Sequence, residues 1–182
     1  MAKEKSIVAL LGNPNSGKSS LFNQLTGLKQ KIGNFPGVTV DKKTGFCKIN
    51  HETEVEIIDL PGTYSIYPNS LDEQVVLDIL ANPASQDYPD LAVVVVDSSN
   101  LKRNLLLFEE VSDLGIPCVL ALNMLDLAEV AGVSVNSGRL QKIMQVPVVE
   151  LNAREGIGIE GLKLTIFNNL RNPESTYQSL DS

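Results

Sequence analysis

Gly12-Asn13-Pro14-Asn15-Ser16-Gly17-Lys18-Ser19 is the stretch that decides the fold of this chain, because it has the form G-x-x-x-x-G-K-[S/T]. An apolar run, residues 7–11, comes directly before it. After it, apolar residues recur on one side of a helix-like stretch, at Leu21, Phe22, Leu25 and Leu28. In a strand–loop–helix unit, backbone N–H groups and the positive end of the helix surround phosphate oxygens. The stretch therefore predicts a phosphate-binding loop in an α/β domain.

Two side chains of this loop carry specific chemistry. Lys18 is long enough to reach terminal phosphates, and the Ser19 hydroxyl is placed to bind Mg²⁺. The alternative is a glycine-rich turn that occurs by chance, but chance does not account for the flanking strand and helix. We therefore expect a nucleoside triphosphate to be bound by this loop and the next residue: Gly12, Asn13, Pro14, Asn15, Ser16, Gly17, Lys18, Ser19 and Ser20.

The composition is that of one globular domain. Hydrophobic residues make up 43% of the 182 residues and charged residues 20%, which is enough for a buried core. The net charge of −7 disfavours nucleic acid as the main partner. The longest aliphatic run, residues 91–96, is far shorter than the ~18 residues that span a bilayer, so we expect no membrane segment here. Cys47 fits a strand and Cys118 a buried apolar position, and neither pattern indicates a disulfide or a metal site.

Strand-like and helix-like segments alternate along the chain, which predicts a parallel sheet with helices on both faces. Five buried strands are expected at residues 6–11, 55–60, 91–97, 117–123 and 147–152. An edge strand is expected at residues 38–49, antiparallel to 55–60 through a turn near Asn50 and His51. We interpret His51, the only histidine, as a turn residue without a catalytic role. The predicted fold is a three-layer α/β sandwich whose six-stranded, mostly parallel sheet has one antiparallel edge strand.

Helices are expected between these strands. Ser70 and Glu73 form a capping box that opens a helix to about residue 80, and Gly115 suits the end of a helix over residues 101–114. Two more helices are expected at residues 137–145 and 158–171. Residues 1–172 then form one domain, and 173–182 form a polar tail or a linker to a further domain.

A second motif, Asp59-Leu60-Pro61-Gly62, follows the strand at 55–60, and open α/β sheets bind ligands at the carboxyl ends of their strands. We expect the Asp59 carboxylate to hold Mg²⁺, directly or through water, and the Gly62 N–H to contact a γ-phosphate. Alone, Asp-x-Pro-Gly is a common turn. Its place after a phosphate-binding loop makes it a candidate nucleotide contact that includes Leu60 and Pro61.

Asn123-Met124-Leu125-Asp126 follows another strand and is similar to the guanine-reading motif Asn-Lys-x-Asp. The Asp126 carboxylate can accept hydrogen bonds from both N1–H and the exocyclic amine of guanine, a donor pair that adenine lacks. The alternative role for Asp126 is a helix cap. Met124 replaces the usual lysine, so its aliphatic stem would cover the base without a charge.

Asn152-Ala153-Arg154 occupies the place of a loop that offers a backbone N–H to the guanine O6. Such loops usually read Ser-Ala-Lys or a near variant. Asn152 departs from that pattern, which leaves open how stiff the loop is and hence how fast a nucleotide is released.

The segment Gly33-Asn34-Phe35-Pro36-Gly37-Val38-Thr39 lies between the phosphate-binding loop and Asp59. A threonine in this position can close over a nucleotide and give Mg²⁺ a second hydroxyl when the γ-phosphate is present. Thr39 is the candidate, with Gly37 and Val38 beside it, and a plain surface loop is the alternative.

With these elements in order, the chain resembles the Ras-like small GTPases of the phosphate-loop class. Over about residues 6–171 it resembles more closely the cytoplasmic G domain of the bacterial ferrous-iron transport protein B (FeoB) family. The resemblance rests on four stretches, residues 12–19, 33–40, 59–65 and 123–126, together with Pro89-Asp90 and Asn100-Leu101-Lys102-Arg103-Asn104-Leu105. It implies GTP and GDP as ligands with Mg²⁺, and a location at the cytoplasmic face of the inner membrane. It also implies a following helical regulatory domain and a polytopic membrane domain, so we expect this chain to be an excised fragment.

The hydrolytic machinery lacks two common parts. Thr63 stands where many GTPases have a glutamine. None of the four arginines, Arg103, Arg139, Arg154 and Arg171, lies in either expected switch segment, the one that carries Thr39 or the one that begins at Asp59. The resemblance implies that K⁺ supplies the missing charge, held by Asn15 and by backbone carbonyls of Gly33 and Phe35. The alternative is that Asn15 only shapes the loop and binds no cation. We predict slow, K⁺-stimulated hydrolysis in which Asn15, Lys18, Thr39 and Gly62 take part, with backbone groups near Thr39 and Gly62 orienting the water.

Two other functions fit the same motifs. One is a GTPase of ribosome assembly or tRNA modification, although no basic face or RNA-binding appendage is evident. The other is a nucleotide-dependent interaction module with negligible hydrolysis. No residue can be assigned to iron binding.

Overall fold

The structure of this chain, a computed structural model, describes residues 5–173. These residues cover the predicted domain except at its first four positions. The predicted tail at 173–182 lies outside the described residues, apart from Pro173. Among residues 5–173, no helix is both long and apolar enough to cross a bilayer.

The strands form one sheet with the order β2-β3-β4-β1-β5-β6-β7. Their bounds are β1 Ile7–Gly12, β2 Lys31–Asn34, β3 Asp41–Lys48, β4 Glu54–Asp59, β5 Leu91–Asp97, β6 Cys118–Asn123 and β7 Val148–Glu150. Five neighbouring strands are parallel to one another: β4, β1, β5, β6 and β7. Strand β3 is antiparallel to both β2 and β4. The prediction of a mostly parallel sheet with an antiparallel strand at 38–49 is confirmed.

The prediction was wrong about the edge of the sheet and the number of strands. β2 lies outside β3 and pairs with it from Lys31↔Thr44 to Asn34↔Asp41, which makes seven strands instead of six. All four residues of β2 are exposed, so it carries no apolar alternation that a sequence pattern could reveal.

The helices confirm most of the sequence prediction. Their bounds are α1 Lys18–Thr26, α2 Leu71–Leu80, α3 Leu101–Asp113, α4 Leu125–Val130, α5 Ser137–Met144 and α6 Ile159–Arg171, with a 3₁₀ turn at Ser98–Asn100. Ser70 Oγ accepts a hydrogen bond from the Glu73 N–H at 3.2 Å, as the capping box predicts, and the Glu73 carboxylate accepts one from the Asn69 N–H at 2.6 Å. Gly115 follows Leu114, the C-cap residue of α3. Its φ of 79° is the left-handed conformation expected there. The short helix α4 was not predicted.

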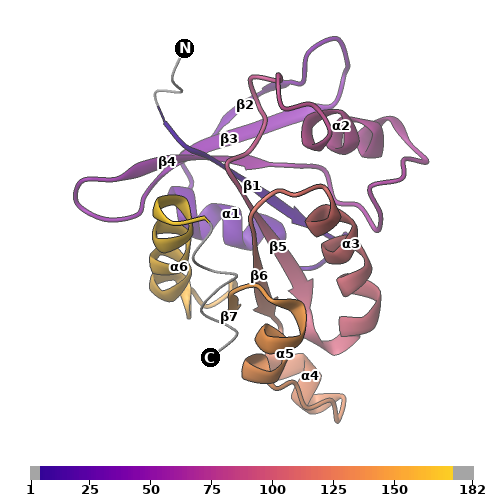
Figure 1. The fold of residues 1–182 in the computed structure, drawn as a ribbon, viewed down its shortest axis with the longest axis vertical. Coiled ribbons are helices and arrows are strands. Elements are labelled where there is room, and N and C mark those ends of the chain that lie inside the picture. Colours follow the sequence, from indigo (N-terminus) through magenta and orange to yellow (C-terminus); the bar gives the residue numbers. More distant parts are fainter. Residues whose placement is uncertain (1–4, 174–182) are drawn as a thin grey trace.

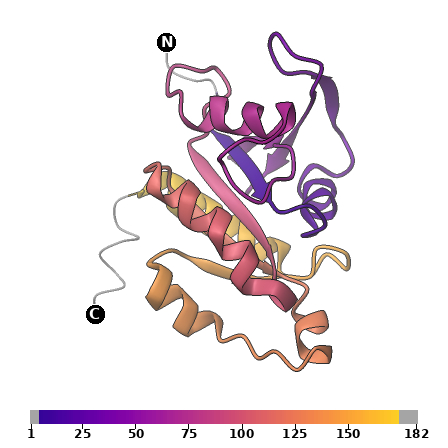
Figure 2. The same cartoon turned by 90° about the vertical axis from the view of Figure 1, so that its right-hand side faces the viewer.

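The helices form layers on the two faces of the sheet (Figures 1 and 2). Alternate residues of β5 pack on opposite faces of the sheet. One set packs in a cluster with residues of α2, α3 and α5: Ala92, Val94 and Val96. The other set packs in a cluster with residues of α1 and α6: Leu91, Val93 and Val95. All six are fully buried, and burial of each valine or leucine side chain contributes about 1.5–3 kcal/mol relative to exposure. This double burial explains why β5 is a continuous aliphatic run.

The parallel strands end at one edge of the sheet, because β1, β4, β5 and β6 all run in the same direction. Their last residues are Gly12, Asp59, Asp97 and Asn123. Three of these four begin or belong to the motifs singled out in the sequence. The fold therefore gathers the candidate site at the carboxyl edge, where open α/β sheets bind their ligands.

Candidate nucleotide-binding site

The phosphate-binding loop needs glycine at two positions. A Cβ on Gly12 would lie 2.5 Å from Ser16 Oγ and 2.8 Å from the Val95 carbonyl oxygen. A Cβ on Gly17, which has φ 92°, would lie 2.0 Å from Asn123 Nδ2. Both spacings are far below ordinary van der Waals contact. The backbone is therefore packed against β5 and β6 so closely that no side chain fits.

Polar groups of the loop are buried without partners. Four buried side-chain N or O atoms in residues 5–173 accept or donate no hydrogen bond, and three of them are Asn13 Nδ2, Asn13 Oδ1 and Ser16 Oγ. An unpaired buried polar group costs about 1–3 kcal/mol. Unsatisfied groups of this kind are concentrated at functional sites, which is consistent with a ligand-binding loop.

The N-terminus of α1 can receive an anion. Gly17 caps this helix without a side-chain hydrogen bond, and the first turn contains no acidic residue. The first N–H groups of a helix have no partner within it, and its dipole favours negative charge there. The residues therefore fit a phosphate group.

A cavity of about 400 Å³ opens beside this helix end, and we name it the Lys18 cavity. Its lining contains the predicted residues Lys18, Ser19, Thr39, Asp59, Leu60 and Pro61. It also contains Val40, Asp41, Lys43 and Asp72, which the sequence did not single out. The structure thus brings the three predicted Mg²⁺ ligands, Ser19, Thr39 and Asp59, to one cavity.

Lys18 and Asp59 form an ion pair inside this cavity. Only 10% of the Lys18 side chain and 8% of the Asp59 side chain are exposed, so the pair is largely shielded from water. Ion pairs in such a low dielectric are strong, and removing one partner leaves a costly unpaired charge. A phosphate group that draws Lys18 away must therefore be accompanied by another cation near Asp59.

Gly62 lies directly over the phosphate-binding loop. A Cβ on Gly62 would touch Pro14 at 3.4 Å, and the next residue, Thr63, donates its N–H to the Gly12 carbonyl at 3.1 Å. The Asp-x-x-Gly motif and the phosphate-binding loop are consequently tied together by a backbone hydrogen bond.

The Thr63 side chain is fully engaged elsewhere. It is 1% exposed, and its hydroxyl contacts the Ser65 carbonyl at 2.6 Å and the Glu73 carboxylate at 3.2 Å. The following residues are held by α3, because the Glu110 carboxylate accepts from Ser65 Oγ at 2.8 Å and from the Ile66 N–H at 2.8 Å. Thr63 is therefore a structural residue of this segment.

Thr39 lies in the loop of a β-hairpin formed by β2 and β3. Phe35 and Val40 are buried at the two ends of this loop, and the Phe35 N–H donates to the Val40 carbonyl at 3.0 Å. The Phe35 carbonyl accepts from the Val38 N–H at 3.3 Å, and Gly37 has φ 75°. Gly33 pairs with Lys42 in the hairpin ladder. Of the predicted K⁺ ligands, Gly33 and Phe35 thus belong to the hairpin, whereas Asn15 is an exposed loop residue with φ 64°.

A second cavity, of about 260 Å³, adjoins the same loop at Gly17 and Ser20, and we name it the Asp126 cavity. It is lined by the predicted residues Gly17, Ser20, Asn123, Met124, Asp126, Asn152 and Arg154. Leu127 and Glu155 also line it and were missed, because α4 was not predicted and Glu155 follows the predicted loop motif. Met124 adopts φ 61° at the start of α4, so the chain turns sharply between β6 and Asp126.

Asn123 joins the walls of the Asp126 cavity. Its Nδ2 donates to the Ser16 carbonyl at 3.0 Å, and its Oδ1 accepts from the Ala153 N–H at 3.1 Å. Both contacts are buried. Asn123 therefore connects the phosphate-binding loop to the loop at 152–154.

The loop that begins at Asn152 is closed by its first side chain. Asn152 and Ile157 exchange two backbone hydrogen bonds, at 2.9 and 3.0 Å, and Asn152 Oδ1 accepts from the Glu155 N–H at 3.2 Å. The sequence left the stiffness of this loop open. The structure shows that the asparagine amide closes the turn.

The thiols take no part in this site. Burial raises the pKa of the Cys47 thiol to about 11 and that of Cys118 to about 12, so both are protonated near neutral pH. Both are buried and free. Cys47 lies in β3, and Cys118 is the buried first residue of β6, which agrees with the strand position predicted for the one and the buried position predicted for the other. Residues 5–173 contain no group of three or more His, Cys, Asp or Glu side chains that could hold a metal ion.

Comparison with known proteins gives a consistent result. The family model described as "Ferrous iron transport protein B" matches residues 6–166. Over 169 residues, the chain is 48% identical to the Fe(2+) transporter FeoB of Salmonella typhimurium and 47% identical to that of Escherichia coli K12. In both cases the match covers 90% of this chain but 21% of the relative, so this chain spans about a fifth of their length.

Solved structures show the same relationship. The cytosolic domain of L. pneumophila FeoB has a TM-score of 0.84 and 40% identity, covering 90% of this chain and 63% of that one. The G domain of T. maritima FeoB has a TM-score of 0.81 and 39% identity, covering 91% and 98%. An S. thermophilus NFeoB mutant bound to GDP has a TM-score of 0.79 and 42% identity, covering 88% and 61%. The extent of the family match and these identities show that the chain belongs to the ferrous iron transport protein B family, and that its fold is that of the FeoB G domain.

Proposed function

We propose that this chain binds guanine nucleotides and hydrolyses GTP slowly, as the domain that regulates ferrous iron uptake by a longer membrane protein. One observation carries the proposal: the Asp126 cavity is lined by Gly17 and Ser20, and the Lys18 cavity by the two residues between them, Lys18 and Ser19. A nucleotide that spans the loop would place its base in the first and its terminal phosphates in the second. The solved S. thermophilus relative is bound to GDP, which supports the same class of ligand.

Asp126 is the residue proposed to select guanine. Its carboxylate is exposed in the cavity and can accept the two hydrogen bonds that guanine offers. With adenine, the same carboxylate would face an acceptor and lose both bonds. Sites that bind through such pairs discriminate strongly, by about 10⁴–10⁵-fold in favourable cases.

Mg²⁺ fits the oxygen groups of the Lys18 cavity. Mg²⁺ is bound by hard oxygen ligands, and in nucleotide sites by one or two protein groups together with the substrate phosphates. Ser19, Thr39 and Asp59 supply two hydroxyls and one carboxylate there. When bound, the ion would neutralise phosphate charge and compensate Asp59 after Lys18 turns to the phosphates.

Slow hydrolysis is expected because, among residues 5–173, no arginine lines the Lys18 cavity. Arg103 lies over the ring of Tyr64 at 4.0 Å, Arg171 lies over that of Phe167 at 5.3 Å, and Arg154 lines the Asp126 cavity. Thr63 is held by Ser65 and Glu73. We propose that Lys18 neutralises developing charge, and that backbone groups near Thr39 and Gly62 orient the attacking water.

K⁺ is proposed as the remaining positive charge, with Asn15 and the carbonyls of Gly33 and Phe35 as ligands. Because Asn15 has φ 64°, an alanine there would change the backbone as well as remove the amide. Asn15→Gly keeps the left-handed conformation and removes only the side chain. We expect wild type to release phosphate over many turnovers faster in K⁺ than in Na⁺, and Asn15→Gly to lose this difference while still binding GDP. Negligible release by wild type in either salt would instead indicate a switch module.

We also propose that residues 1–172 act as the G domain and that the chain works at the cytoplasmic face of the inner membrane. A helical regulatory domain and a polytopic membrane domain are its partners in the full-length protein. These proposals are supported by the family and by the curated relatives, of which the match covers 21%.

The experiment that tests the central proposal is calorimetric titration of wild type and Asp126→Asn with GDP, GTP, ATP and xanthosine triphosphate. Wild type should prefer guanine nucleotides over ATP by about 10³-fold or more. Asp126→Asn should lose affinity for guanine and gain it for xanthine, because the carbonyl of xanthine accepts what the new amide donates. Equal binding of ATP and GTP by wild type would refute the proposal.

A further inference from the structure

The hairpin that carries Thr39 is attached to the protein on one side only. β2 pairs with β3 and forms the free edge of the sheet, and β3 pairs with β4. The loop at residues 35–40 connects β2 to β3, so the position of Thr39 depends on how the beginning of β3 is held. A contact at that point can therefore control the Lys18 cavity.

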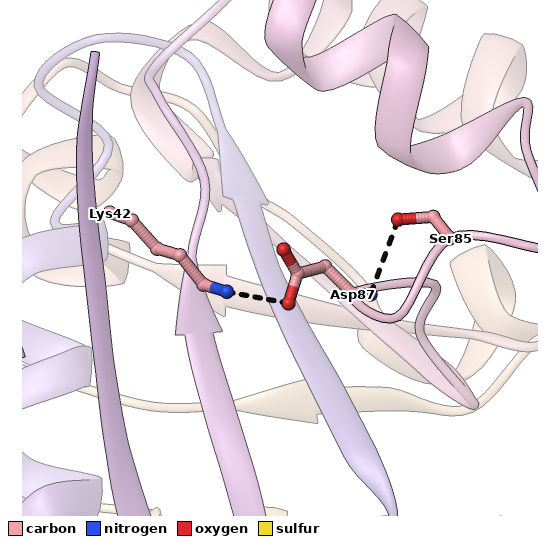
Figure 3. Close-up of polar contacts among 3 residues, drawn as sticks. All are labelled: Lys42, Ser85 and Asp87. Atoms are coloured by element: carbon pink, nitrogen blue, oxygen red, sulfur yellow. Dashed lines mark hydrogen bonds and ion pairs between the residues drawn. The ribbon is translucent and has the colours of Figure 1, made fainter. Parts of the chain in front are cut away.

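Lys42, at the beginning of β3, makes such a contact. Its Nζ lies 2.6 Å from Asp87 Oδ1, across 45 residues of sequence (Figure 3). The Lys42 side chain is 21% exposed and that of Asp87 8%. Lys42 Nζ also lies 5.9 Å from the centroid of the Phe35 ring, at the opposite end of the Thr39 loop. One ammonium group thus contacts the hairpin loop and the body of the protein.

Asp87 is also held by hydrogen bonds within its own segment. Its N–H donates to Ser85 Oγ at 3.2 Å, as Figure 3 shows, and the Ser85 N–H donates to the Asn82 carbonyl at 2.9 Å. Further along the same segment, Asp90 accepts from the Ile7 N–H at 2.8 Å and donates its own N–H to the Ile7 carbonyl at 2.8 Å. The segment at residues 82–90 is therefore fastened to β1, the strand that leads into the phosphate-binding loop.

Strand geometry links this ion pair to the cavity. Successive side chains of a strand point to opposite faces, and Asp41 and Lys43 both line the Lys18 cavity. Lys42, between them, points to the other face, where it meets Asp87. Holding Lys42 consequently fixes the rotation of the strand that presents Asp41 and Lys43 to the cavity and that follows Thr39.

We propose that Lys42 and Asp87 are a positioning pair for Thr39: their ion pair keeps the Thr39 hairpin over the Lys18 cavity, and so favours the triphosphate over the diphosphate. The inference rests on the proposed function. Asp87 belongs to neither cavity, and Lys42 touches the hairpin from the face opposite to the Lys18 cavity. Both residues act through Thr39 and not on the nucleotide.

Loss of the ion pair between Lys42 and Asp87 is expected to weaken binding of the triphosphate and to leave binding of the diphosphate unchanged. A diphosphate is held by the phosphate-binding loop and the Asp126 cavity, which the hairpin does not build. A triphosphate also needs Thr39 in place, so its apparent dissociation constant rises as the competent fraction of the hairpin falls. If one molecule in ten keeps the hairpin in place, affinity for the triphosphate falls by about tenfold.

The test compares Asp87→Asn and Lys42→Met with wild type, using GDP and a non-hydrolysable GTP analogue in the presence of Mg²⁺. Each variant should bind the analogue about tenfold more weakly and GDP within about twofold of wild type. Lys42→Arg keeps the charge and should retain wild-type affinity for the analogue. The control is Lys163→Met, which breaks the ion pair between Lys163 and Glu160 at 3.2 Å on α6 and should leave both affinities unchanged.

A double variant separates positioning from general loss of structure. In a Thr39→Ala background, adding Asp87→Asn should cause no further loss of analogue affinity, because the pair acts through Thr39. Thermal melting of each variant shows whether it is folded, and the ratio of the two affinities in one sample does not depend on the folded fraction. An unchanged ratio in Asp87→Asn and Lys42→Met, or a further tenfold loss in the Thr39→Ala background, would overturn the inference alone. A wild-type chain that binds neither nucleotide would overturn the proposed function and this inference with it.

Discussion

The two ends of the candidate site are built from different kinds of contact. The Asp126 cavity is joined by neutral hydrogen bonds of asparagine side chains: Asn123 connects two loops, and Asn152 closes a turn. The Lys18 cavity is held by charges, because Lys18 is paired with Asp59, and the hairpin beside it is fastened by Lys42 and Asp87. One end is joined by side chain–backbone bonds and the other by ion pairs.

The difference indicates which end can change with the ligand. Neutral bonds to the backbone have no reason to break when a nucleotide binds, so the base end is preorganised. The pair of Lys18 and Asp59 competes with phosphate for the same ammonium group, so the phosphate end has to rearrange. We therefore expect variants at the base end to weaken GDP and GTP equally, and variants around the hairpin to weaken GTP selectively.

The largest effect is expected from Lys18→Met. The variant removes the ammonium group that contacts the phosphates and leaves Asp59 as a shielded charge without its partner. Affinity for both GDP and GTP should fall by about 10²-fold or more. Calorimetric titration measures this loss, with Lys48→Met on the exposed end of β3 as the control. Retained affinity would mean that the loop does not bind phosphate through this lysine.

An intermediate effect is expected from Asn123→Ala, which removes both bonds across the Asp126 cavity. Each lost bond leaves a buried backbone group unpaired, at a cost of about 1–3 kcal/mol. GDP and GTP affinities should fall by the same factor, and the melting temperature should drop.

Asn104→Ala is the matched control for Asn123→Ala. Asn104 is also buried and makes two bonds to the backbone, accepting from the Asp97 N–H at 3.1 Å and donating to the Asn100 carbonyl at 2.9 Å. The Asn104→Ala variant should have a lower melting temperature and an unchanged affinity for nucleotides. A selective loss of GTP in Asn123→Ala would contradict the view that the base end serves both nucleotides alike.

The smallest effect is expected from Asn152→Ala, which opens one turn. Loss of a single hydrogen bond costs about 0.5–1.5 kcal/mol, so GDP release should accelerate by about two- to tenfold. Stopped-flow release of a fluorescent GDP measures it. Asn136→Ala loses the same kind of bond, from the Arg139 N–H at 2.8 Å at the start of α5, and should not alter release. Unchanged release in Asn152→Ala would show that this side chain does not limit the base loop.

Much of the fold was predictable because local patterns report local structure. The aliphatic run of β5, the cap of α2 and the glycine after α3 each depend on residues within one element, and the structure confirms all three. β2 was missed because its four residues are exposed and pair only with β3. α4 was missed because it has six residues and starts from a left-handed Met124.

The candidate site divides in the same way. The sequence motifs identified five site residues, because each residue type has a chemistry that fits its place in a motif: Lys18, Ser19, Thr39, Asp59 and Asp126. Asp41, Lys43 and Asp72 line the Lys18 cavity but belong to none of these motifs. Their pattern is that of ordinary strand and helix surfaces, so no sequence signal distinguishes them.

The sequence by itself determined that a phosphate-binding loop lies between a strand and a helix, and which side chains can meet a nucleotide. Only the tertiary structure decided which distant residues hold them: Asn123 reaches Ser16 across 107 residues, and Lys42 reaches Asp87 across 45. The physical reason is that such contacts depend on strand order and register, which bring separate segments to one edge of the sheet. Local propensities and motif spacings carry information about the segment in which they occur, and none about which segment becomes its neighbour.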